Sequence, residues 1–225
     1  IGLGIPAEPL FRSLSLWLES GRTMGTTVDA RKDEFPQYDE WKASCIGNGT
    51  IRILDENGWE VNNAIANMKK RMSMDYGLYW SINTATVNAA KELDLCDITD
   101  VMDRVGLHQA DTLDGINPET PSFLLGAQPI APMSQATGFA TFANDGVTCE
   151  ARALTKVTDP QGNTYKVPAT DCEQVIESDI VAQLNTTLKR IASDRIAMDA
   201  IDFPIAGKTG TNDNESSTCH TQFAE

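Results

Sequence analysis

Apolar residues recur three and four places apart along much of the chain, and this spacing constrains the fold more than any other feature of the sequence. The clearest case is residues 84–95, in which Ala85, Ala89 and Leu93 form one apolar stripe. The same reading, with Gly, Pro and Ser as start and stop signals, predicts further helices at other places. These are residues 11–20, 63–74, 97–106, 132–146 and 178–191.

Strand-forming patterns are shorter and lie mainly in the last third of the chain. Residues 22–60 are polar and rich in Gly and Asn, which indicates loops with short strands. Residues 157–165 contain a Pro-x-Gly-Asn turn between two short strands, and residues 201–206 predict one more strand. Together the patterns predict an α+β fold, with a helical lobe packed on an antiparallel sheet.

Charge excludes two classes of function. The chain has 225 residues, a length that fits one domain or a large piece of one, and a formal net charge of −14. So acidic a protein would repel nucleic acid and anionic lipid surfaces. The sequence has neither a signal-peptide pattern nor an apolar run of the roughly 20 residues that span a bilayer. We therefore expect membrane attachment only through an anchor upstream of these residues.

The five cysteines leave two interpretations open. None forms a Cys-x-x-Cys pair and the chain has two histidines, so we expect no metal site. Cys149 and Cys172 flank the predicted hairpin, and a bridge between them would stabilise the fold by about 3 kcal/mol. A bridge between Cys45 and Cys96 would contribute about 4 kcal/mol. The alternative is that all five are small buried thiols; a bridge would instead imply an oxidising compartment.

Two short polar sequences are candidates for chemistry. Ser81-Ile82-Asn83 interrupts an apolar segment between two predicted helices, and Lys208-Thr209-Gly210 follows the last predicted strand. The second supplies an ammonium, a hydroxyl and an unobstructed backbone, which suits a carboxylate beside an extended peptide. A phosphate-binding loop is excluded, because Asp202 stands where its first Gly is required. Each triplet alone is common as a helix cap or a strand exit.

In combination the two triplets resemble the motifs of serine penicillin-recognising enzymes, which carry Ser-x-x-Lys, Ser-x-Asn and Lys-Thr-Gly. The chain is similar to the transpeptidase domain of bifunctional, class A penicillin-binding proteins, especially those of actinobacteria. The resemblance covers residues 13–218 and implies a penicillin-binding protein/serine β-lactamase-like fold that lacks terminal strands. Residues 1–12 and 219–225 diverge from the family, so we expect a fragment or an altered gene product. Further family phrases are Leu18-Glu19-Ser20-Gly21-Arg22, Leu125-Gly126, Pro132-Met133-Ser134-Gln135-Ala136, and Ala143-Asn144-Asp145-Gly146.

The resemblance also implies roles for the site residues. Ser81 and Lys208 would form a proton relay beside the nucleophile, and Asn83 would hydrogen-bond the amide of a bound peptide. Thr209 and Thr211 would bind the substrate carboxylate, while Gly210 leaves room for it. The implied partners are peptidoglycan stem peptides ending in D-Ala-D-Ala, and β-lactams, with no cofactor, on the extracytoplasmic face of the membrane.

One family motif is absent. No Lys in the sequence has a Ser three places before it, and the expected positions hold Ala7 and Leu10. Neither side chain can attack a carbonyl or accept a proton. Three hypotheses follow: part of a peptidoglycan D,D-transpeptidase, an inactive domain that binds stem peptides or β-lactams reversibly, and a serine β-lactamase. The last ranks lowest, since no deacylating Glu loop is recognisable and Ile82 stands where those enzymes usually have Asp.

Overall fold

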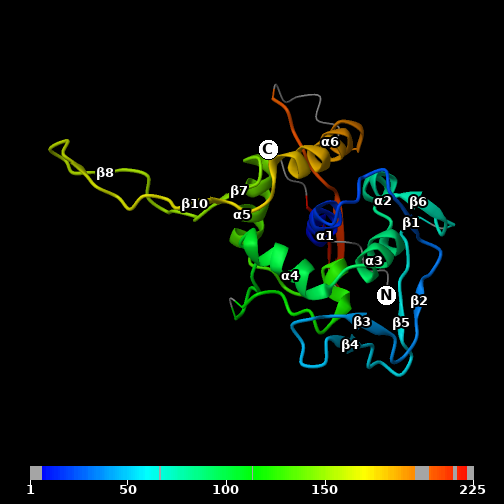
Figure 1. The fold of residues 1–225 in the computed structure, drawn as a ribbon. Helices are drawn as coiled ribbons and strands as arrows, with labels where there is room; N and C mark the ends of the chain where they lie inside the picture. Colours follow the sequence, from blue (N-terminus) through cyan, green and yellow to red (C-terminus); the bar gives the residue numbers. More distant parts are fainter. Residues whose placement is uncertain (1–6, 66, 113, 196–202, 215–216, 222–225) are drawn as a thin grey trace.

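The computed structural model describes residues 7–65, 67–112, 114–195, 203–214 and 217–221. Helices form the centre of this part of the chain and short strands lie around it (Figure 1). The helices are α1 (Ala7–Glu19), α2 (Met74–Trp80), α3 (Asn83–Lys91), α4 (Leu95–Arg104), the 3-10 helix η1 (Pro121–Leu125), α5 (Pro132–Ala143) and α6 (Ser178–Arg195). None of these helices is both long enough and apolar enough to cross a bilayer.

The strands are short and pair two by two. They are β1 (Thr27–Asp29), β2 (Glu34–Phe35), β3 (Glu40–Lys42), β4 (Thr50–Arg52), β5 (Trp59–Glu60), β6 (Arg71–Ser73), β7 (Val147–Cys149), β8 (Val157–Thr158), β9 (Thr164–Tyr165), β10 (Cys172–Gln174), β11 (Gly210–Asn214) and β12 (Ser217–Thr221). The antiparallel pairs are β1 with β6, β2 with β5, β3 with β4, β7 with β10, β8 with β9, and β11 with β12. The fold is α+β, with its antiparallel strands distributed over small ladders.

Helix α1 lies at the centre of the core. It packs against α4, α6, α3 and η1, and its buried side chains include Leu14, Trp17 and Leu18. A second aromatic group fills the space near β2 to β5, where the ring centroids of Phe35 and Trp41 are 5.3 Å apart. These large apolar side chains connect the helices to the N-terminal strands and hold the elements around the candidate site.

The prediction of a helix over residues 63–74 is wrong. This region contains a loop, strand β6 and only the start of α2. The amide of Asn63 explains the difference, because its Oδ1 accepts a hydrogen bond from the Thr84 N–H at 3.0 Å and its Nδ2 donates to the Thr84 hydroxyl. The Thr84 N–H lies in the first turn of α3, where no partner exists within the helix. This segment therefore forms a loop and not a helix, because its Asn63 side chain caps α3.

The prediction of a strand over residues 201–206 is also wrong for its described part, residues 203–206. Residues 201 and 202 lie outside the described part of the chain, and residues 203–206 have no strand structure. Pro204 has no N–H to give to a ladder. The strand begins at Gly210 instead, where β11 pairs with β12 in the register Gly210 to Thr221.

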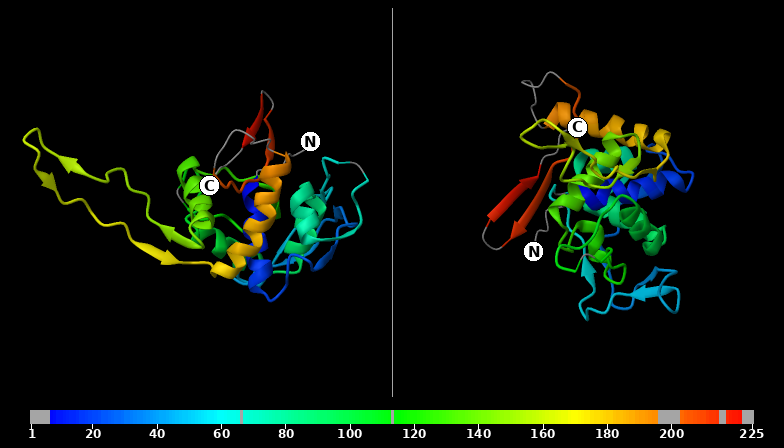
Figure 2. Two further views of the ribbon diagram at one scale, coloured as in Figure 1. Left: turned by 90° about the horizontal axis from the view of Figure 1, so that it is seen from above. Right: turned by 90° about the vertical axis from the view of Figure 1, so that its left-hand side faces the viewer.

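A long hairpin projects from the helical body (Figure 1, left). Residues 147–174 form this arm, with the β7–β10 pair at its base and the β8–β9 pair near its tip. The left view of Figure 2 shows the arm extending away from the compact group of helices. The hairpin predicted around residues 157–165 is present, with Val157 opposite Tyr165.

Candidate active site

The junction between α2 and α3 places Ser81. Helix α2 ends at this residue, which adopts the left-handed conformation with φ 55° and ψ 50°. The N–H of the next residue, Ile82, returns to the Gly77 carbonyl at 2.9 Å, which closes the turn. A Cβ on Gly77 would lie 3.0 Å from the Cβ of Ala85, so glycine lets the two helices approach closely at this point. The turn leaves the Ser81 hydroxyl half-buried at the end of α2.

Asn83 is the first residue of α3 and is 3% exposed. Its Nδ2 donates a hydrogen bond to the Asn62 carbonyl at 2.6 Å. Its Oδ1 is buried and has no hydrogen-bond partner within the described residues. A buried amide oxygen without a donor is unusual, since such groups are nearly always satisfied. This oxygen is therefore an acceptor available to a donor that the described residues do not supply.

Lys208 reaches the α2–α3 junction from a distant part of the sequence. Its ammonium donates hydrogen bonds to the Ser81 hydroxyl, 127 residues away, and to the Thr209 carbonyl at 2.7 Å. The segment before it is tied to α6, because the Gly207 N–H donates to the Leu188 carbonyl at 3.3 Å. The structure thus brings the two polar triplets together at Ser81 and Lys208. Asn83 lies two residues from Ser81, with its side chain on Asn62.

Burial changes the acidity of Lys208. The residue is 1% exposed, and both of its hydrogen-bond partners are neutral oxygens. Burial, together with the positive charge of Arg195, lowers the pKa of Lys208 to about 8. A lysine whose pKa lies this close to neutrality can release and accept a proton under physiological conditions.

Arg195, at the C-terminal end of α6, is the site residue that the sequence did not reveal. Its guanidinium donates a hydrogen bond to the Tyr79 carbonyl at 2.6 Å and lies 5.2 Å from the centroid of the Trp80 ring. These contacts attach α6 to the last turn of α2, directly before Ser81. No motif surrounds Arg195, and its place follows only from the packing of α6 on α2.

The three predicted substrate-binding residues lie just before or at the start of β11: Thr209 precedes the strand, and Gly210 and Thr211 are its first two residues. Thr209 is half-buried beside Lys208, and Gly210 is buried. Thr211 pairs with His220 through the backbone, and its side chain lies outside the described part of the structure. Strand β11 therefore begins directly beside the ammonium of Lys208, which is the arrangement that an extended peptide with a terminal carboxylate requires.

A hydroxyl hydrogen-bonded to a lysine of lowered pKa can relay protons in an acyl transfer without histidine. Such a relay needs a nucleophile, and the sequence has no Ser-x-x-Lys to supply the one that the family uses. Ala7 and Leu10, at the expected positions, belong to α1, and their side chains fall outside the described structure. Within the described residues no group of three His, Cys, Asp or Glu side chains is arranged to hold a metal ion.

Comparison with known proteins identifies the family. The model of the penicillin-binding protein transpeptidase domain matches residues 46–223. The chain belongs to this family. Among curated relatives, penicillin-binding protein 1A of Aquifex aeolicus is 27% identical over 199 residues, and penicillin-binding protein 1B of Haemophilus influenzae is 26% identical over 171 residues. These alignments cover 88% and 74% of the chain but only 24% and 21% of the relatives.

Solved structures of penicillin-binding proteins share the fold. The chain superposes on the penicillin-binding protein PonA1 of Mycobacterium tuberculosis with a TM-score of 0.70 and 18% identity, covering 98% of this chain and 55% of that one. Penicillin-binding protein A of the same organism, solved as an imipenem acyl-enzyme, gives a TM-score of 0.69 and 16% identity, covering 99% and 52%. At this identity the similarity establishes a penicillin-binding transpeptidase fold.

Two disulfides hold the penicillin-binding domain together away from the site. Cys45 is bonded to Cys96 and Cys149 to Cys172, with Cα atoms 5.9 and 4.1 Å apart. The second bridge joins residues directly opposite each other in the β7–β10 pair. All four cysteines named as disulfide candidates are therefore paired. The side chain of the fifth, Cys219, lies outside the described structure.

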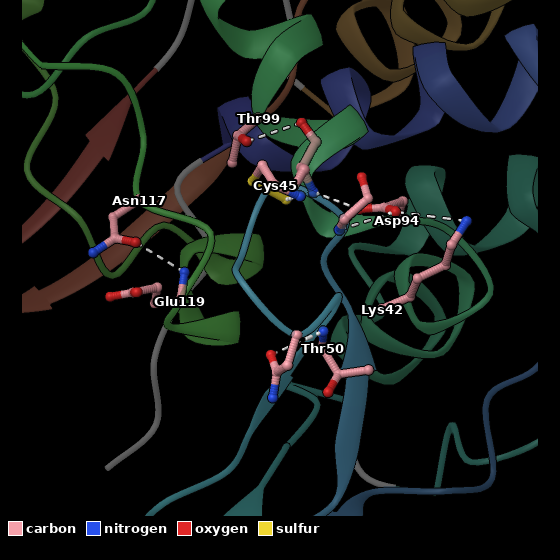
Figure 3. The surroundings of a disulfide bond; sticks show 10 residues. Lys42, Cys45, Thr50, Asp94, Thr99, Asn117 and Glu119 are labelled. Carbon is pink, nitrogen blue, oxygen red and sulfur yellow. Dashed lines mark hydrogen bonds and ion pairs between the residues drawn. A yellow bond between two sulfur atoms is a disulfide. The ribbon is translucent and has the colours of Figure 1, made fainter.

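The first bridge is surrounded by hydrogen bonds to Asp94 (Figure 3). The Asp94 carboxylate caps α4 by accepting from the Cys96 N–H at 3.0 Å, and it also accepts from the Ser44 N–H at 3.1 Å. Lys42 lies 3.5 Å from the same carboxylate. Burial acts to raise the pKa of Asp94, but these hydrogen bonds and the ammonium outweigh it and hold the pKa below its usual value.

Proposed function

We propose that this chain provides the proton-relay and peptide-binding part of a peptidoglycan D,D-transpeptidase site. In such an enzyme a serine attacks the penultimate D-alanine carbonyl of a stem peptide and releases the terminal D-alanine. The acyl group then passes to an amine of a neighbouring strand. The observation that carries the proposal is the hydrogen bond between Lys208 and Ser81. It unites the two triplets that the family uses, although they are far apart in sequence.

Each site residue has a proposed role. Ser81 and Lys208 relay protons, and the unpartnered Oδ1 of Asn83 accepts the amide N–H of the bound peptide. Thr209 and Thr211 bind the terminal carboxylate, and Gly210 lets the peptide backbone approach β11. The parent protein, by this proposal, is a bifunctional class A enzyme of actinobacterial type, anchored upstream in the membrane and active on its extracytoplasmic face. Residues 13–218 form its transpeptidase domain.

Because the chain has no Ser-x-x-Lys, we propose that on its own it binds stem peptides and β-lactams reversibly. The feature that favours this second function is a proposed peptide clamp at Asn83, Lys208 and Thr209 without an identifiable nucleophile. Removing a covalent nucleophile eliminates most of the rate of an acyl-transfer enzyme, while interactions of the remaining groups with the ligand persist. The proposal of a β-lactamase receives no comparable support, because no deacylating carboxylate is recognisable.

Calorimetry with a peptide ending in D-Ala-D-Ala tests the binding function. Saturable heat is expected with the unaltered chain, and at least about tenfold weaker binding with Lys208→Ala, since charge-assisted hydrogen bonds contribute about 1.5–3 kcal/mol. Lys189→Ala, which removes an exposed lysine of α6, serves as the matched control and should bind normally. An absence of heat with the unaltered chain would remove the binding function.

A fluorescent penicillin tests the covalent step. We expect no label that survives denaturation, because the acyl-enzyme requires a nucleophilic serine. A denaturation-resistant label would show that the chain has a nucleophile after all, and peptide mapping of the labelled residue would identify it. In that case the first function, and not reversible binding, describes the chain as it stands.

A further inference from the structure

The arm of residues 147–174 has opposite charges at its two ends. Its distal part, residues 154–167, carries two basic side chains, Lys156 and Lys166, and one acidic side chain, Asp159. Its base carries three acidic side chains, Glu150, Asp171 and Glu173, and one basic side chain, Arg152. Neither Lys156 nor Lys166 forms an ion pair with a described residue. In a chain of net charge −14, the distal arm is thus a locally positive segment.

Apolar groups accompany the charges of the distal arm. Leu154 is 57% exposed and Tyr165 is 55% exposed, and Val157 stands directly opposite Tyr165 in the β8–β9 pair. Among the described residues, strands β8 and β9 pair with no strand but each other, so their outer edges are open. A basic and apolar surface on an isolated hairpin buries nothing within its own chain. It is suited to a partner that offers acidic groups and apolar surface together.

The turn at the tip is held in one conformation by a single carboxylate. Asp159 accepts hydrogen bonds from the N–H groups of Gln161 and Asn163, from the Asn163 amide at 2.7 Å and from the Tyr165 hydroxyl at 3.1 Å. These bonds position Tyr165 relative to the turn before any partner is present. Preorganisation of this kind reduces the conformational entropy that binding would otherwise remove.

A groove at the base of the arm complements the tip. Its volume is about 730 Å³, and it lies between the end of α4, the start of α5 and the β7–β10 pair. Its lining includes the acidic side chains Asp103, Glu150, Asp171 and Glu173, and Met133, which is 68% exposed. Arg104 also lines the groove, with its guanidinium bound to Glu19 at 3.0 Å. The groove is therefore acidic and partly apolar, as a partner of the tip should be.

We propose that the arm binds a second copy of this chain, with the tip of each arm in the basal groove of the other. Two hairpins that lie side by side and antiparallel place each tip beside the other's base. That geometry joins Lys156 and Lys166 of one copy to Asp171 and Glu173 of the other, and it does so twice around a two-fold axis. About a dozen residues separate base from tip, and they reach up to roughly 40 Å, which is enough to bridge two bodies.

Sedimentation velocity of charge-reversed variants tests this pairing. Lys156→Glu/Lys166→Glu reverses the tip, and Asp171→Lys/Glu173→Lys reverses the base. The unaltered chain should dimerise at low salt, and each variant alone should be monomeric, because its tips and bases then carry like charges. An equimolar mixture of the two variants should form a heterodimer, since the negative tip of one meets the positive base of the other. Lys70→Glu/Lys189→Glu, which alters exposed lysines of the body, should dimerise like the unaltered chain.

Salt separates this dimer from an association through apolar surface alone. Raising the ionic strength to about 1 M, where the Debye length falls to about 3 Å, should weaken the dimer by at least about tenfold. A chain that stays monomeric at all concentrations would overturn the proposal, as would a dimer that both charge-reversed variants retain. Failure of the mixture to recover dimerisation would also overturn it, because charge complementarity between tip and base is its central claim.

Discussion

The arm and the helical body are stabilised in different ways. The body, meaning the described residues outside the arm, buries large side chains such as Trp17, Trp41 and Phe35. The arm has no buried residue from position 147 to 174, and it depends on hydrogen bonds of its own turn and on one disulfide at its base. Regions with few buried contacts open with small free energies, whereas a packed core opens only with the whole domain. The body should therefore unfold as one unit while the arm responds locally.

The largest contrast is expected for matched aromatic truncations. Trp17→Ala removes a fully buried side chain of α1 and should lower the free energy of unfolding by about 3–5 kcal/mol. Tyr165→Ala removes an exposed side chain of the arm and should change it by less than about 0.5 kcal/mol. Urea unfolding followed by tryptophan fluorescence and circular dichroism measures both. Similar losses in the two variants would show that the arm belongs to the cooperative core.

The next contrast concerns lysine side chains and the pH dependence of stability. Lys208 is buried in the body, whereas the lysines of the arm are exposed. The pKa of Lys208 is about 8 in the folded protein against 10.5 for an ordinary lysine, so the unfolded chain binds more protons between these values. Stability should therefore rise with pH from about 8 to about 10.5, by up to about 3 kcal/mol, and this contribution is absent from Lys208→Met. Urea unfolding across that range measures it, with Lys166→Met as the arm control. A rise that Lys208→Met retains in full would assign it to other groups.

Two glycines with the same backbone conformation sharpen the comparison further. Gly146, before the arm, and Gly162, at its tip, both have φ of +88°. A Cβ at Gly146 would lie 2.0 Å from the Ile176 carbonyl oxygen, whereas a Cβ at Gly162 meets nothing within 4 Å. Gly146→Ala should thus lower the free energy of unfolding by more than about 2 kcal/mol. Gly162→Ala should lower the stability of the arm by only about 1 kcal/mol, which is the energy an alanine loses in the left-handed backbone conformation. Thermal unfolding of both variants measures the difference, and equal melting temperatures would contradict it.

The smallest effect on the body is expected from reduction of the arm disulfide. Each bridge has one exposed cysteine, Cys172 in the arm and Cys45 in the body, but the second cysteine is half-buried in the arm (Cys149) and only 8% exposed in the body (Cys96). Exposed disulfides are the more readily reduced. A dilute dithiol should open Cys149–Cys172 first, without loss of the near-ultraviolet circular dichroism of the body. Alkylation and mass spectrometry give the order, and earlier alkylation of Cys96 would contradict it.

The sequence predicted a helix correctly where the periodicity and the start and stop residues of the segment itself determine its structure. The stripe of Ala85, Ala89 and Leu93 lies on the buried side of α3 or just after it, and Pro132 starts α5 as its punctuation indicated. The prediction over residues 63–74 was wrong because Asn63 contacts α3, and no periodicity of its own segment reveals that contact. Helical spacing alone does not show whether a polar side chain in the segment forms hydrogen bonds to a different helix or strand.

The candidate site was predictable as far as its motifs extend. Ser81, Asn83 and Lys208 were selected because they belong to two short triplets, Ser-x-Asn and Lys-Thr-Gly, that follow each other in the family's order. The structure joins Ser81 to Lys208 by a hydrogen bond. Arg195 could not be found this way, because its importance comes from the place where α6 ends relative to Tyr79 and Trp80. The charge reversal along the arm was equally visible in the sequence. Its meaning required the groove, which residues from four separate segments create.

The position of Asp94 bears on how the chain acquires its covalent crosslinks. One carboxylate accepts from the backbone N–H of Cys96 and from that of Ser44, the neighbour of Cys45, and neither contact involves a sulfur atom. We therefore expect the same contacts to hold the two cysteines near each other in a reduced chain, which would favour this pairing when the thiols are oxidised.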